Sequence, residues 1–246
     1  MKNEVRINKM KINFIHDFNL NSEEGFFKIQ KRLAKDIKLK NSFCIDNIKT
    51  CAGVDLAYWI KDEEEYATCC IVIIDYKTKE VLEKVYSYGK INEPYIPGYL
   101  AFRELPLIIK AVEKLKIEPD IFVFDGNGYL HFNHMGSATH ASFFLNKATI
   151  GVAKSYLKIK GIDFEMPKEE IGAYNDIVID NEVYGRVLRT RSNVKPIFIS
   201  CGNYIDLETS TEIIMNLLYK DSRIPIPVRL ADLETHTMRN ELKEKI

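Results

Sequence analysis

The hydrophobic and polar positions along the chain predict a run of strands first, and strands alternating with helices afterwards. Three β-rich segments follow one another at 50–60, 66–76 and 80–91, and the short polar stretches KDEEE and KTKE separate them. Polar turns between apolar runs of this length are typical of an antiparallel meander. We therefore predict that one part of the sheet is antiparallel and consecutive in sequence.

The central part of the chain has a different pattern. Residues 119–126, PDIFVFDG, form a continuous apolar run, which is expected of a strand that is covered on both faces. A predicted helix over 136–147 and a strand over 148–153 follow it and complete a βαβ unit. Further on, the pattern predicts a hairpin over 177–190 and one more strand over 196–200.

Cap residues and helical spacing predict four further helices: one over 22–40, a long amphipathic one after the prolines and glycine that open 94–117, one over 206–220, and one that closes 225–246 after its prolines. Ser22 caps the first of these, and Asp206 or Thr209 caps the third. Pro106 lies inside the second, where it either kinks the helix or makes it restart. The fold class is thus α/β: a single domain over residues 1–246, with a mixed sheet that has helices on both faces.

Composition narrows the class of protein only slightly. Lys+Arg and Asp+Glu both number 35, so the formal net charge is zero, which argues against a uniformly basic surface but still allows a local basic groove. The five cysteines are odd in number and lack paired zinc-ligand spacing, so we expect reduced thiols in a cytoplasmic protein. No apolar run approaches membrane-spanning length, and we expect a monomer without a membrane partner.

Two predicted strands carry an acid where an apolar residue would be less costly. Asp55 lies in the middle of CAGVDLAYW, and Asp125 ends IFVFDG. Each has an ordinary explanation, a hydrogen-bonded or strand-end acid at Asp55 and a turn acid before glycine at Asp125. If the two strands are neighbours, however, the carboxylates form an oxygen-rich site of the kind that Mg²⁺ prefers.

Two more acids can complete such a site. Glu104 lies in the helix after the proline-rich segment, and Asp232 lies on the last helix; the ordinary alternatives are an exposed glutamate and a capping or surface aspartate. A magnesium carboxylate cluster is suited to phosphodiester hydrolysis, because the metal activates water and holds the leaving oxygen. The pattern therefore indicates a nuclease.

Five segments, taken in order, resemble the endonuclease V (deoxyinosine 3′ endonuclease) family: CAGVDLAY, PYIPGYLAFRELP, PDIFVFDGNGYLH, ATIGVAKSYL and RIPIPVRLAD. They extend from about residue 50 to about residue 233. The resemblance implies a ribonuclease H-like fold and a Mg²⁺-dependent hydrolase, in which Mn²⁺ can substitute. Such an enzyme nicks DNA at the second phosphodiester bond 3′ to deoxyinosine, leaves a 5′-phosphomonoester and initiates repair of the deaminated adenine.

The resemblance also assigns the catalytic residues. Asp55 and Asp125 match the family's direct metal ligands, and Glu104 matches the acid that completes the metal site. Asp232 matches the late acidic or histidine position on the C-terminal helix. Lys154 matches a lysine that follows the buried strand and holds a phosphate oxygen; its ordinary alternative is an exposed lysine at a strand end.

A second group of matched residues concerns nucleic-acid binding. Tyr95 matches the family's wedge tyrosine, and its neighbours Pro94 and Ile96 belong to the same stiff loop. A rigid aromatic side chain can fill the gap that an extruded base leaves in the stack. The ordinary alternative is that Tyr95 packs in a proline-rich turn.

The glycine turn after Asp125 matches the pocket for the base. Gly126, Asn127 and Gly128 would let a backbone amide approach O6 of inosine, and His131 matches the histidine after the turn. The chain departs from the family at Asn127, where histidine is frequent, and at Asn203 in SCGN. These departures leave the preference between DNA and RNA open.

Three alternatives therefore remain at this point. The chain can be an inosine-specific RNA endonuclease, a non-catalytic binder of deaminated nucleic acid, or a structural or metabolic protein with unrelated acids. The segment RVLRTRSNVK is expected to present Arg189 and Arg191 as a basic stripe toward a nucleic-acid backbone, because alternate residues of a strand share a face.

Overall fold

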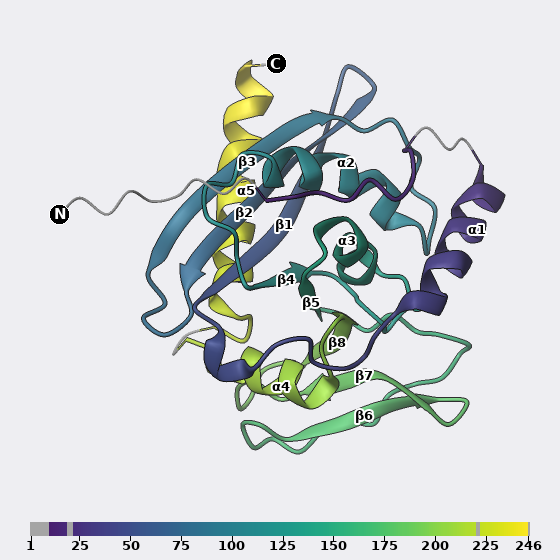
Figure 1. Ribbon diagram of the computed structural model, residues 1–246, viewed down its shortest axis with the longest axis vertical. Helices are drawn as coiled ribbons and strands as arrows, with labels where there is room; N and C mark the ends of the chain where they lie inside the picture. The colour runs from purple at the N-terminus through teal and green to yellow at the C-terminus, as the bar shows by residue number, and fades with distance from the viewer. Residues whose placement is uncertain (1–9, 19–21, 220–221, 246) are drawn as a thin grey trace.

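An eight-stranded sheet runs through the computed structural model, which describes residues 10–18, 22–219 and 222–245 (Figure 1). The strands are β1 (Thr50–Lys61), β2 (Glu64–Asp75), β3 (Val81–Lys90), β4 (Ile121–Asp125), β5 (Ala148–Ala153), β6 (Tyr174–Ile179), β7 (Glu182–Leu188) and β8 (Ile197–Asn203). Their order in the sheet is β3-β2-β1-β4-β5-β8-β7-β6. The β1–β4 and β4–β5 pairs are parallel and the other pairs are antiparallel, so the predicted mixed sheet with a leading meander is confirmed.

Helices cover both faces of the sheet, as predicted. They are α1 (Glu23–Leu33), α2 (Leu100–Val112), α3 (Ser137–Leu145), α4 (Leu207–Asn216) and α5 (Ile226–Lys245). Helices α2 and α3 share one apolar core with β1, β2 and β4, and α4 and α5 share a second core on the opposite face (Figure 1). Within the described parts of the chain, none of the helices is both long enough and apolar enough to cross a membrane.

Several local predictions are confirmed in detail. The β6–β7 hairpin turns at Asp180 and Asn181, which both have positive φ, as the tight turns that suit twisted hairpins require. The side chain of Asp206 accepts a hydrogen bond from the Thr209 N–H at 2.7 Å and caps α4. Helix α2 continues through Pro106 without a break, so the alternative of a restarted helix is wrong.

Other predictions place an element correctly but misjudge its ends. Helix α1 is capped by Ser22 but ends at Leu33, after which Ala34–Asp36 form a single 3₁₀ turn. Helix α2 begins at Leu100, after the predicted proline-rich loop, but ends at Val112, before the end of the predicted segment at 117. The predicted domain over 1–246 also includes 1–9, 19–21, 220–221 and 246, which lie outside the described residues.

The predicted basic stripe near the end of β7 is wrong. Arg189 is buried, and its guanidinium group donates to backbone carbonyls and forms an ion pair with Glu169. Arg186, three residues earlier, is also buried and pairs with Asp176 and Glu208. These arginines neutralise acids and fill hydrogen-bond positions inside the fold, so they cannot face a phosphate backbone.

Candidate metal and active site

The register between β1 and β4 brings the two strand acids together. In this parallel pair, Val54 lies opposite Phe124. Asp55 and Asp125 each follow one of these residues, so they occupy equivalent positions and share a face of the sheet. Asp125 is the last residue of β4, whereas β1 continues beyond Asp55 to Lys61. Asp125 therefore lies at the carboxyl end of β4, with Asp55 beside it.

Helix α5 brings a third acid to the same place. Asp232 lies on this helix, whose first turns pack against β1. The close approach depends on Gly53, because a Cβ atom there would lie 2.1 Å from the carbonyl carbon of Pro227. Gly53 was not predicted from the sequence; its position two residues before the half-buried Asp55 was the available signal.

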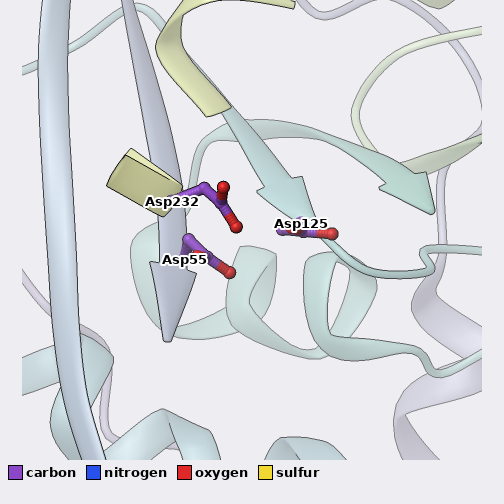
Figure 2. A group of neighbouring side chains, drawn as sticks. All are labelled: Asp55, Asp125 and Asp232. Atoms are coloured by element: carbon purple, nitrogen blue, oxygen red, sulfur yellow. The ribbon is translucent and has the colours of Figure 1, made fainter. Parts of the chain in front are cut away.

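The three aspartates form one group. Figure 2 shows Asp55, Asp125 and Asp232 as neighbouring side chains that come from β1, β4 and α5. Each offers one carboxylate oxygen, and these oxygens all lie within 4.8 Å of one another. The donor set fits a hard divalent cation, because Mg²⁺ binds through oxygen ligands and accepts one or two carboxylates together with water or phosphate.

Lys154 places a positive charge beside these acids. It follows β5, and its Nζ lies 2.6 Å from Asp125 Oδ2 and 2.9 Å from Asp232 Oδ1. Burial lowers the pKa of Lys154, but the hydrogen bonds and charges of Asp125 and Asp232 outweigh burial and raise it. The ammonium group thus remains charged and neutralises part of the acidic group.

The surroundings of Asp55 and Asp125 disfavour their charged forms. Burial and the negative charge of Asp125 raise the pKa of Asp55 to about 7, although Lys154 opposes the shift. Burial also raises the pKa of Asp125, against the hydrogen bond from Lys154. The Thr235 hydroxyl lies 3.1 Å from Asp55 Oδ2, one turn after Asp232 on α5. A bound divalent cation would relieve this repulsion, which is further evidence that the site fits one.

Glu104 lies apart from the three aspartates. Among the described residues, the acids close enough to one another to share a metal ion are the three aspartates, and Glu104 is not part of this group. It is buried on α2, where its carboxylate accepts hydrogen bonds from Ser137 Oγ at 2.7 Å and Tyr58 Oη at 3.0 Å. Burial raises its pKa to about 7. Its assignment as a metal ligand stays a prediction, and its two hydroxyl partners were not found from the sequence.

The proline-rich loop presents an aromatic side chain to solvent. Tyr95 is 65% exposed, and Pro94 is exposed beside it, whereas Ile96 is half-buried. The guanidinium carbon of the buried Arg103 lies 5.7 Å from the Tyr95 ring centre and 5.3 Å from that of Tyr58. A cation over an aromatic face is attracted to it, so Arg103 stabilises the position of the Tyr95 ring.

The glycine turn after β4 is tightly built into the sheet. Gly126 has φ +149°, and a Cβ atom there would meet open space. At Gly128 a Cβ atom would lie 2.2 Å from the carbonyl oxygen of Cys201. The Gly126 N–H donates to Val152 O and the Gly128 N–H donates to Ser200 Oγ, both at 2.9 Å. These two amides are therefore engaged within the protein, and only the Gly126 side of the turn is open.

The remaining residues predicted around the base are partly or wholly buried. Asn127 is half-buried, and its Oδ1 has no hydrogen-bond partner among the described residues. His131 is buried, its Nδ1 accepts from the backbone N–H of Asn133 at 3.2 Å, and burial lowers its pKa to about 4. Asn203 is fully buried and its Oδ1 accepts from the Lys38 N–H at 2.7 Å. His131 and Asn203 thus hold loops in place as neutral side chains.

An open groove extends from Asp125 along the glycine turn. Its lining residues are Asp125, Gly126, Asn127, Ala153, Lys154, Ser155, Tyr156 and Leu157. The groove therefore combines an acid of the three-aspartate group, the lysine beside it and the turn that follows β4. It has the composition expected of a surface that receives a phosphate and the nucleotide attached to it.

Comparison with known proteins shows that the chain is similar to endonuclease V proteins. The family model for endonuclease V matches residues 31–233. Endonuclease V of Clostridium acetobutylicum is 66% identical over 233 residues, which are 95% of this chain and 100% of that protein.

Solved structures give the same result. The crystal structure of endonuclease V from Bacillus subtilis has a TM-score of 0.94 and 60% identity, and the match covers 96% of this chain and 100% of that one. Endonuclease V of Ciona intestinalis, in complex with a 24mer DNA containing an inosine followed by a ribo-adenosine, has a TM-score of 0.77 and 29% identity, over 91% of this chain and 98% of that one. The predicted ribonuclease H-like fold is confirmed by these matches.

Proposed function

Because the chain belongs to the endonuclease V family, we propose that it is a Mg²⁺-dependent endonuclease that nicks DNA at the second phosphodiester bond 3′ to deoxyinosine. The observation that carries this proposal is the group formed by Asp55, Asp125 and Asp232 beside Lys154. The relative from Ciona intestinalis binds inosine-containing DNA, which supports the choice of substrate. The product would be a 5′-phosphomonoester, and the reaction would initiate repair of deaminated adenine.

The three aspartates would hold the cation, and Mn²⁺ is expected to replace Mg²⁺ because both accept carboxylate oxygens. When bound, the cation supplies charge neutralisation at the phosphate and lowers the pKa of water. Lys154 offers a second positive charge at the mouth of the groove, where it can hold a phosphate oxygen. Glu104, with a pKa of about 7, can take up or release a proton near neutral pH.

Two other parts of the surface would bind the nucleotide. Tyr95 stands exposed on a loop stiffened by prolines, so it can enter the base stack at little entropic cost. The open side of the turn at Gly126 and the carboxamide of Asn127 line the groove that leads from Asp125. An extruded base placed there would lie close to the acids that act on its backbone.

The test is a cleavage assay with labelled oligonucleotides. One strand contains a single deoxyinosine and its matched control contains adenine, each with Mg²⁺ or EDTA, and Asp55→Ala is assayed in parallel. We expect one nick, one nucleotide beyond the deoxyinosine, that requires both Mg²⁺ and Asp55. Binding without cleavage would replace the proposal with a non-catalytic binder of deaminated nucleic acid.

Inosine in RNA is the second candidate substrate. The DNA bound by the Ciona relative carries a ribonucleotide next to the inosine, so a ribose 3′ to the base is compatible with binding in that protein. An inosine-containing RNA of the same sequence, assayed beside the DNA, ranks the two substrates by kcat/KM.

A further inference from the structure

Helix α1 buries a polar side chain where its packing pattern calls for an apolar one. Its buried face consists of Phe26, Gln30 and Leu33, which are spaced as one helical stripe. The Phe26 ring stacks on Phe102 of α2 at 4.2 Å between centres. Gln30, in the middle of the stripe, is fully buried. Burying an amide is unfavourable unless it is hydrogen-bonded, so its partners explain its presence.

Gln30 bonds to two separate segments of the chain. Its Nε2 donates to the carbonyl oxygen of Gly98 at 2.9 Å and lies 3.5 Å from that of Met135. Its Oε1 accepts from Nδ2 of Asn133 at 2.8 Å. Both the donor and the acceptor of the amide therefore have hydrogen-bond partners, and these partners lie on different segments.

These two segments are the loops that would bind the substrate. Gly98, with φ +89°, follows the proline-rich loop that carries Tyr95. Asn133 and Met135 belong to the loop that follows Asp125 and contains the glycine turn. The loops also touch directly, because a Cβ atom at Gly98 would lie 3.4 Å from the Phe132 ring. Figure 1 shows α1 at the margin of the molecule, outside the sheet.

We propose that Gln30 is a positioning residue that fixes the Tyr95 loop relative to the loop after Asp125, and thereby sets the preference for an inosine-containing strand over an ordinary one. The proposal rests on the proposed function. A base that leaves the stack must travel from the wedge to the pocket, so the distance between these loops decides how well both are occupied at once. Gln30 does not touch the substrate; it acts through Gly98 and Asn133.

The packing role of α1 provides the control. Leu33 lies on the same buried face, and it contributes to packing alone. Gln30→Met keeps the length of the side chain but removes both hydrogen bonds, whereas Leu33→Met introduces the same side chain on the same face with little change in volume and no loss of a hydrogen bond. Thermal melting of both variants reports the structural cost, which is expected to be larger for Gln30→Met because it leaves the Gly98 carbonyl and the Asn133 amide without their partner.

The decisive readout is selectivity. Affinity is measured by fluorescence anisotropy for a labelled deoxyinosine oligonucleotide and for the same strand with adenine, and kcat and KM are measured with Mg²⁺. In Gln30→Met we expect affinity for the deoxyinosine strand to fall about tenfold and affinity for the adenine strand to change less than twofold. In Leu33→Met both affinities should stay within twofold of the original protein.

A third variant tests the path of the effect. Asn133→Leu removes the partner of Gln30 Oε1, so its loss of selectivity and that of Gln30→Met should be less than additive in the double variant. Unchanged selectivity in Gln30→Met, or an equal loss in Leu33→Met, would overturn the proposal. If the unaltered protein does not cleave the deoxyinosine strand at all, the proposed function fails; if it cleaves and Gln30→Met is equally selective, only the positioning role fails.

Discussion

At the scale of single residues, the acids of the site suit the binding of a cation but lower the stability of the fold when they are charged and no cation is bound. Asp55 is half-buried beside Asp125, and its carboxyl group has a pKa of about 7. A carboxyl group whose pKa is higher in the folded than in the unfolded state stabilises the fold in acid. That contribution is complete below about pH 4, the ordinary pKa of aspartate, and is lost as the pH rises through about 7.

Removing the charge at Asp55 should therefore stabilise the protein in the absence of metal. We expect Asp55→Asn to raise the free energy of unfolding at pH 8 by about 1–3 kcal/mol and to abolish cleavage. Urea denaturation at pH 8 and pH 4, in EDTA, measures the effect, which should disappear at the lower pH. A variant that is less stable at pH 8 would contradict the electrostatic account.

Arg103 gives a second prediction at this scale. Replacement by methionine removes the cation beneath Tyr95 and leaves Glu65, its ion-pair partner at 2.7 Å, without a counterion. We expect Arg103→Met to weaken binding to a deoxyinosine strand by about 1 kcal/mol, because Tyr95 loses part of its support. Binding is measured in EDTA, with Tyr95→Ala as the reference. If Arg103→Met weakens binding equally in the Tyr95→Ala background, Arg103 acts through a residue other than Tyr95.

At the scale of elements, the site depends on how closely α5 approaches β1. The helix carries Asp232, and the strand carries Asp55, so their separation sets the geometry of the three-aspartate group. Gly53 permits that approach, because backbone atoms of Pro227 and Val228 occupy the space of a side chain. A tight contact between two backbones is thus part of the site although it includes no ionisable group.

A single methyl group at Gly53 should disturb both stability and activity. We expect Gly53→Ala to lower the free energy of unfolding by about 1–3 kcal/mol, since overpacking forces α5 away from β1. The Mg²⁺-induced rise in melting temperature should also shrink, because Asp232 moves with the helix. Gly89→Ala is the matched control, since a Cβ atom there would meet Leu107 at an ordinary 3.5 Å.

At the scale of the whole molecule, a contact between distant parts of the sequence makes the stability of the fold depend on pH. The segment before α1 packs on α3, where Nε2 of His16 and Nε2 of His140 lie 2.8 Å apart. One imidazole must donate and the other accept, which two neutral rings can do. Burial lowers the pKa of His16 below its ordinary 6.5 and lowers that of the fully buried His140 still further.

This histidine pair should make the fold sensitive to acid. Below about pH 6.5 both histidines bind protons in the unfolded chain but stay neutral in the folded protein. The contribution of the pair to stability is therefore present above that pH and is lost as the pH falls. We expect His16→Asn to lose stability less steeply than the original protein between pH 6.5 and 5, by about 1 kcal/mol per pH unit. Urea denaturation across this range provides the measurement; parallel curves for the two proteins would contradict it.

The sequence alone determined much of the architecture, because strand and helix periodicity, caps and turn residues act locally. Asp55 and Asp125 could be singled out since an acid in an apolar strand is visible without a structure, and the ordered motifs gave the family. The predicted C-terminal ends of α1 and α2 were less accurate, because the charged residues near them satisfy more than one local pattern.

Only the tertiary structure decided which side chains meet. The β1–β4 register placed Asp55 beside Asp125, and the glycine contact brought Asp232 to them, while Glu104 remained apart with its hydroxyl partners. Arg189, which the strand pattern assigned to a basic stripe, is buried instead, because it pairs with Glu169 and donates to backbone carbonyls. Strand and helix formation depend on neighbours within a few residues, whereas the distances between acids depend on packing across the whole chain, and no local pattern encodes them.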